Sequence, residues 1–63
     1  MTTNEDRATR FAEILPLYPE DERTNLIDLL ADAMHWCNLS HVDFEDVLRV
    51  AIMHFEAERD EAA

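Results

Sequence analysis

The chain contains no glycine among its 63 residues. Glycine supplies the positive φ angles of tight hairpin turns and the close backbone approach of phosphate-binding loops. Its absence therefore argues against glycine-rich nucleotide-binding loops and against a fold built on tight β-hairpins. No segment of four or more residues alternates between apolar and polar side chains as a strand would. Together these features favour an all-α fold.

The short length limits the chain to a single domain over residues 1–63. A domain of this size buries only about 60% of the surface that its unfolded chain exposes. Small domains therefore often depend on a disulfide, a metal or a partner subunit. The single cysteine excludes an intramolecular disulfide. A bound metal or oligomerisation remains as a source of added stability, unless the helices pack unusually well.

Apolar residues recur at helical spacing in three segments, which predict a small three-helix bundle. The expected helices span about residues 3–15, 20–39 and 43–58. Beyond residue 58, the sequence places acidic side chains at the negative end of the third helix dipole. We therefore expect this acidic C-terminal tail to fray.

Two pairs of residues have the three-residue spacing of a capping box, in which a side chain and a backbone amide bond each other reciprocally. Thr2 and Glu5 form the first pair, and Asp43 and Asp46 form the second. The first helix is thus predicted to start near Thr2 or Thr3, and the third to be capped by Asp43.

Two prolines mark the connector between the first two helices. Pro16 is expected to end the first helix near Leu15, because the residue before proline is pushed out of helical angles. The start of the second helix has two alternatives. Pro19 can open it as the first helical residue, or Thr24 can cap it after a separate turn over residues 20–23.

The second and third helices carry more apolar surface than three short helices can hide. The apolar arc of the second helix covers about half of its circumference, wider than the stripe of an ordinary surface helix. Exposed apolar surface of this kind marks an interface. A homodimer or a face for another partner is therefore expected, with interface candidates Leu29, Trp36, Val50, Ile52 and Met53.

The charge is strongly negative. Fifteen acidic residues face five basic ones, all arginine, which gives a formal net charge of −10. Phosphate backbones are repelled by such a surface, so direct nucleic-acid binding is not expected. A protein partner with a basic surface fits the charge. No membrane span or signal peptide is recognised, and the free cysteine points to the cytoplasm.

Two histidines and the cysteine stand close together in the stretch "HWCNLSH". His35 and Cys37 are about 200° apart on a helix, so they cannot share a metal ion. Cys37 falls among leucines, where a thiol behaves as a small buried hydrophobic group. A nucleophilic pair of Cys37 with His41 would need the helix to continue through His41. The sequence predicts that the helix ends there, and no catalytic residue is assigned.

One metal site is worth considering. Asp28, Asp32 and His35 share the polar face of the second helix, and His54 would complete the set if it came from another helix. The ordinary alternative is a solvated face with a weak Asp–His pair. We therefore predict neither a metal nor any other cofactor, and we keep these four residues as metal candidates.

The stretches "LIDLLADAMHWC", "DF" at residues 43–44 and "AIMHFEAE" resemble a group of short uncharacterised bacterial proteins, often carried by plasmids or prophages. The likeness covers roughly residues 26–58 and implies an all-helical fold and a mobile-element context, but no activity. The residues that carry it are Leu26, Asp28, Leu29, Leu30, Asp32, His35, Trp36, Cys37, Asp43, Phe44, Ala51, His54, Phe55 and Glu58.

A weaker likeness is to the all-α nucleotide pyrophosphohydrolases of the MazG type, carried by "DLLADAMHW" and "HVDFEDVL". That family also needs a Glu-Glu-x-x-Glu run on a preceding helix, which this chain lacks. Asp28 and Asp32 are also four residues apart instead of three. These departures put the magnesium site and the hydrolase activity in doubt.

Three functions follow as hypotheses. The first is a small acidic non-enzymatic interaction protein, such as a phage- or plasmid-type inhibitor that occupies a basic nucleic-acid-binding groove in an anti-defence or anti-CRISPR role. The second is a metal-dependent nucleotide hydrolase-like fragment that uses Asp28, Asp32 and His35. The third is a structural homodimer module. We favour the first, with self-association.

Overall fold

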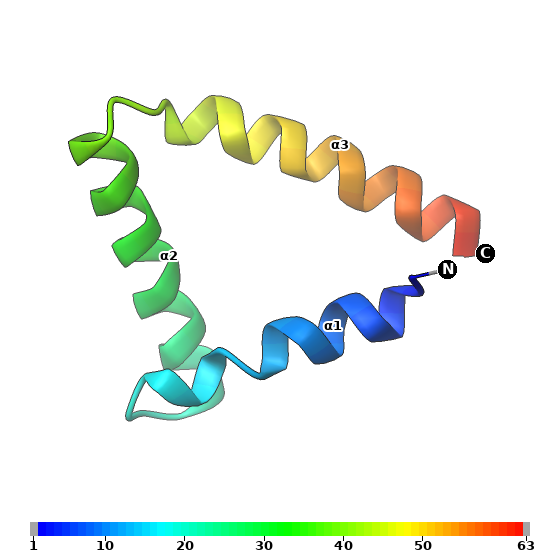
Figure 1. The fold of residues 1–63 in the computed structure, drawn as a ribbon, viewed down its shortest axis with the longest axis horizontal. Helices are drawn as coiled ribbons and strands as arrows, with labels where there is room; N and C mark the ends of the chain where they lie inside the picture. Colours follow the sequence, from blue (N-terminus) through cyan, green and yellow to red (C-terminus); the bar gives the residue numbers. More distant parts are fainter. Residues whose placement is uncertain (1, 63) are drawn as a thin grey trace.

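A computed structural model describes residues 2–62, and these fold into three α-helices and one short 3-10 helix, without a strand. The elements are α1 (Asn4–Ala12), η1 (Leu15–Leu17), α2 (Glu22–Leu39) and α3 (Phe44–Ala62). The predicted all-α class with three helices is confirmed. The α-helices lie along the sides of a triangle, and α1 begins beside the end of α3 (Figure 1).

Helix α1 starts one residue later than the first capping pair predicted. Thr3, in an extended conformation, accepts a hydrogen bond from the Asp6 amide at 3.0 Å, and its own amide donates to the Asp6 carboxylate at 3.1 Å. The capping box therefore pairs Thr3 with Asp6, and the prediction of Thr2 with Glu5 was wrong. The carboxylate of Asp6 also lies at the positive end of the helix dipole.

The first helix ends at Ala12, short of the predicted residue 15. Pro16 has no amide hydrogen to donate to the Ala12 carbonyl, so the α-helical pattern cannot run on through this point. The backbone amides instead donate to carbonyls three residues earlier, that of Ile14 to the Phe11 carbonyl and that of Leu17 to the Ile14 carbonyl. The 3-10 helix η1 is the result.

Helix α2 begins at Glu22, and its cap is Asp21, a residue that neither predicted alternative chose. The Asp21 carboxylate accepts hydrogen bonds from the Thr24 amide at 2.9 Å and from the Thr24 hydroxyl at 2.8 Å. Thr24 is thus a donor inside the first turn. Pro19 precedes the helix by three positions and does not open it. Aspartate at this place satisfies a free amide and suits the helix dipole.

Helix α2 ends in a left-handed turn made without glycine. His41 has a φ angle of 58°, and the Val42 amide donates to the Cys37 carbonyl at 2.9 Å. This is the longer of the two bonds of a Schellman motif, which commonly places glycine at the left-handed position. Because His41 takes that position, α2 stops at Leu39 and the chain turns toward α3.

Helix α3 follows the predicted cap but outlasts the predicted end. The Asp43 carboxylate accepts from the Asp46 amide at 3.3 Å, and the Asp43 carbonyl accepts from the Val47 amide. The helix then continues to Ala62, beyond the expected limit of residue 58. The expected fraying of the acidic tail stays a prediction, and Ala63 lies outside the described residues.

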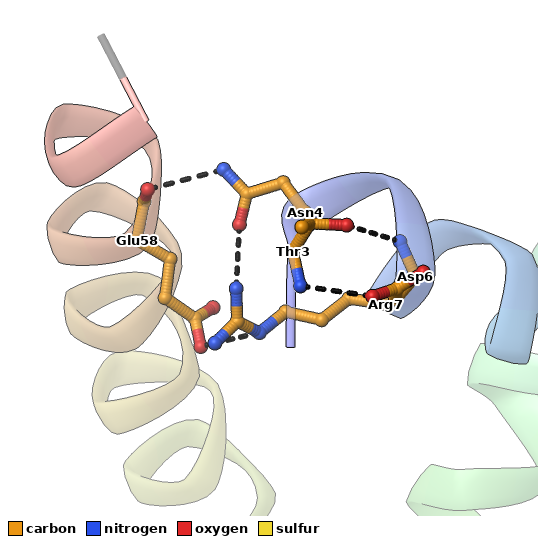
Figure 2. A network of polar contacts seen from close by, with 5 residues as sticks. All are labelled: Thr3, Asn4, Asp6, Arg7 and Glu58. Carbon is orange, nitrogen blue, oxygen red and sulfur yellow. Dashed lines mark hydrogen bonds and ion pairs between the residues drawn. The ribbon is translucent and has the colours of Figure 1, made fainter. Parts of the chain in front are cut away.

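A cyclic set of polar contacts joins the first turn of α1 to the last turns of α3 (Figure 2). The side-chain amide of Asn4 donates to the Glu58 carbonyl at 3.0 Å, and its oxygen accepts from Arg7 at 2.8 Å. Arg7 in turn pairs with the Glu58 carboxylate at 3.0 Å. Phe55 and Arg59 stack nearby at 5.5 Å. These contacts explain why the end of α3 stays helical.

The helices meet mainly at the corners of the triangle, so little of the chain is covered. Among the described side chains, only Cys37 and Asn25 are buried. The Cα radius of gyration is 13.4 Å, whereas a compact domain of this length has about 10.6 Å. No helix within residues 2–62 combines the length and the apolar character needed to cross a membrane.

Candidate interaction surface

One face of α2 is apolar and exposed. Leu26, Ile27, Leu30 and Met34 fall within about 100° of the helix circumference. Their side chains are 40%, 49%, 43% and 53% exposed. No acidic residue of α2 lies within this arc, since its aspartates are on other sides of the helix. We call these four residues the α2 apolar face.

Helix α3 carries a similar surface. Val47, Leu48, Ala51 and Phe55 share one side of α3 with the half-buried Phe44, and the helical spacing of these five residues predicts that this side faces the core. Val47, Leu48 and Phe55 are nevertheless 46%, 44% and 60% exposed, and Ala51 is exposed as well. These four residues form the α3 apolar face. The expected core side of α3 is therefore largely uncovered.

The five predicted interface residues divide into two groups. Trp36, Val50, Ile52 and Met53 are all exposed. Leu29 is half-buried. The exposed four lie outside the two apolar faces, and the predicted interface included no residue of either face. The larger uncovered surface was thus missed.

The histidine–cysteine cluster separates into three different environments. Cys37 is buried, at 6% exposure, as predicted from its place among leucines. His35 is exposed on the other side of α2. His41 lies past the end of α2 and serves as its left-handed cap. The structure therefore does not extend the helix to place His41 beside Cys37.

The metal candidates are not assembled into a site. Within the part of the chain that the structure describes, no three or more His, Cys, Asp or Glu side chains form a group able to hold a metal ion. Asp32 instead accepts a hydrogen bond from the Tyr18 hydroxyl at 2.6 Å. His54 is in the second half of α3, which runs away from α2 after their shared corner (Figure 1).

Asn25 holds the corner between the connector and α2, a role that sequence reasoning missed. Its side-chain oxygen accepts from the Glu20 amide at 2.9 Å. Its side-chain nitrogen donates to the carbonyls of Leu15 at 3.2 Å and Tyr18 at 3.1 Å. All of its hydrogen-bonding atoms find partners, as a buried amide requires. Asn25 directly follows the polar run of residues 21–24, so the sequence offered no signal that set it apart.

Negative charge dominates the remaining surface. Every acidic residue is exposed except Asp28 and Glu58, which are half-buried. Three of the five arginines already lie in ion pairs within the chain, those of Arg7 with Glu58, Arg49 with Asp46 and Arg59 with Asp60. Most of the carboxylates thus have no cation close by to neutralise their field.

Comparison with protein-family models, curated proteins and solved structures gives no significant match for this chain. The likeness to short acidic bacterial proteins, and the weaker one to MazG-type hydrolases, therefore stay predictions.

Proposed function

We propose that the chain is a non-enzymatic protein-interaction module whose acidic helix faces bind a basic surface on another protein. The observation that carries this proposal is the exposure of nearly all carboxylates in a chain of net charge −10, where three arginines are engaged internally. Such a charge distribution produces a negative potential over much of the surface. Potentials of this size steer association with partners of opposite sign.

The spacing of the carboxylates along the helices favours a partner groove lined by basic side chains. Exposed carboxylates such as Glu45 and Glu56 recur along one side of α3. A groove that ordinarily holds nucleic acid offers arginine and lysine side chains at comparable density. In its finer form, the proposal is an inhibitor that occupies such a groove, of the anti-defence or anti-CRISPR type carried by phages and plasmids.

The proposal is tested by affinity capture on the immobilised full chain from a lysate of the encoding cell, followed by titration of the purified captured protein. We expect binding to weaken steeply as salt is raised, because the attraction between opposite charges is screened. Double-stranded nucleic acid should compete with the chain for the same partner.

Matched variants locate the effect. The double variant Glu45→Gln/Glu56→Gln removes two exposed charges from α3 and should weaken binding by roughly tenfold at low salt, which is about 1.4 kcal/mol. His54→Gln changes an exposed side chain on the same helix without removing an acid and should bind as the wild type does. An affinity that does not respond to salt, or the absence of any retained protein, contradicts the proposal.

A further inference from the structure

The isolated chain exposes far more surface than a compact protein of its mass. Its accessible surface is 5548 Å² for 7.4 kDa, whereas folded monomers of this mass expose about 4,200 Å². The excess is therefore about 1,300 Å². The two apolar faces defined above supply many of the exposed hydrophobic side chains. A chain of this size with one cysteine has no intrachain disulfide to compensate.

The excess matches the area that a stable homodimer buries. Obligate homodimers bury about 2,000–5,000 Å² in total, which is about 1,000–2,500 Å² from each protomer. The uncovered surface of this chain falls within that interval. A compact monomer would need no such cover, and a weak transient contact would bury less than this.

The charges favour a second copy as the occupant of these faces. Two chains of net charge −10 repel each other, so they can meet closely only where carboxylates are absent or already paired with a cation. The α2 apolar face contains no acidic residue, and Glu58, the one acid of α3 within the arc of the α3 apolar face, is half-buried and paired with Arg7. A basic partner would instead gain most at the acidic sides of the helices, which these faces do not include.

We infer that the α2 and α3 apolar faces pack against those of a second copy of this chain, in a two-fold symmetric homodimer. In such an interface the same residues meet on both sides, and each protomer completes the core that the other lacks. This inference goes beyond the proposed function and does not depend on it. It uses the apolar faces, whereas the basic partner uses the acidic ones.

The mass of the purified full chain in solution tests whether it forms a homodimer. Light scattering and sedimentation over a concentration series should give twice the chain mass, and the unfolding midpoint should rise with concentration. Added salt should strengthen the dimer, because it screens the repulsion between two acidic chains. A mass of one chain at every concentration and salt level overturns the inference and leaves the basic-partner test unaffected.

Variants then test the faces. Leu30→Asp places a charge at the centre of the α2 apolar face and should give monomers. His35→Asp adds the same charge at an exposed position about 140° around the helix and should remain dimeric. Met34→Gln preserves side-chain length and helix propensity, so it tests the face even if Leu30→Asp does not fold. Met34→Gln should weaken dimerisation about tenfold, and full dimerisation of both face variants overturns the assignment.

Discussion

At the scale of single residues, Tyr18 ties the connector to α2 through one short hydrogen bond. Its hydroxyl donates to the Asp32 carboxylate at 2.6 Å. Loss of the proton would break this bond, and it would also place a phenolate in partly desolvated surroundings near Asp32 and Asp28. The pKa of Tyr18 is therefore raised above the ordinary value for tyrosine. Because this pKa is raised, the contact stabilises the fold at pH values below the ordinary pKa of tyrosine. This stabilisation is lost as the pH rises through the raised pKa of Tyr18.

Tyr18 is the only tyrosine, so an alkaline titration followed by ultraviolet absorbance reports on it alone. We expect its pKa in the folded chain to exceed that in urea-unfolded chain. Asp32→Asn should lower the folded pKa toward the ordinary value, because the strongest acceptor and the nearest charge are both lost. His35→Gln, one turn further along α2, should leave the titration unchanged. Equal pKa values for Asp32→Asn and the wild type would contradict the assigned contact.

At the scale of helices, the ends of each element are set by local hydrogen bonds. The caps of α1 and α2 lower the pKa values of Asp6 and Asp21, in each case chiefly through a backbone amide, of Thr3 for Asp6 and of Thr24 for Asp21. Groups with lowered pKa values stabilise the fold at pH values above their ordinary pKa. That stabilisation disappears as the pH falls through the lowered pKa. Acid should therefore loosen the starts of these two helices.

The end of α2 offers a stabilising substitution. His41 occupies the left-handed region, which costs a residue with a Cβ atom about 1–2 kcal/mol relative to glycine. His41→Gly should raise the free energy of unfolding by about 1 kcal/mol, after glycine's greater loss of backbone freedom is deducted. Ser40→Gly is the matched control, because Ser40 has a φ of −96° and gains nothing from glycine. Urea unfolding at fixed protein concentration measures both, and a less stable His41→Gly would contradict the cap assignment.

The caps also show what could be predicted from sequence. Asp43 was identified correctly because it directly precedes the apolar repeat that begins at Phe44 and has Asp46 at the capping spacing. Thr2 with Glu5 and Thr3 with Asp6 have the same spacing, so sequence alone could not choose between these two registers. Asp21 was missed although its bonds to Thr24 are local, because Pro19 and Thr24 offered competing helix starts on either side of it. The apolar faces were found, but their exposure reflects helix orientation, which periodicity does not encode.

At the scale of the whole molecule, the triangle is closed by the contacts among Asn4, Arg7 and Glu58 (Figure 2). Asn4→Ala removes the bond to the Glu58 carbonyl and the acceptor for Arg7. It should lower the free energy of unfolding by about 1–2 kcal/mol and speed amide exchange in residues 58–61. Thr9→Ala, at an exposed position of the same helix, is the control and should change neither. Unchanged exchange in Asn4→Ala would contradict the closing role.

The closing contact joins residues 54 positions apart, whereas Asn25 reaches Leu15 over 10 positions and Tyr18 reaches Asp32 over 14. For a flexible chain, bringing ends together over 54 residues costs about 1.5 kcal/mol more entropy than over 10. The corner between the connector and α2 therefore forms at a lower entropy cost, and the junction of α1 with α3 should form last. By the same reasoning, that junction should break first on heating. Helix α1 would then separate from α3 while the contacts between the connector and α2 remain.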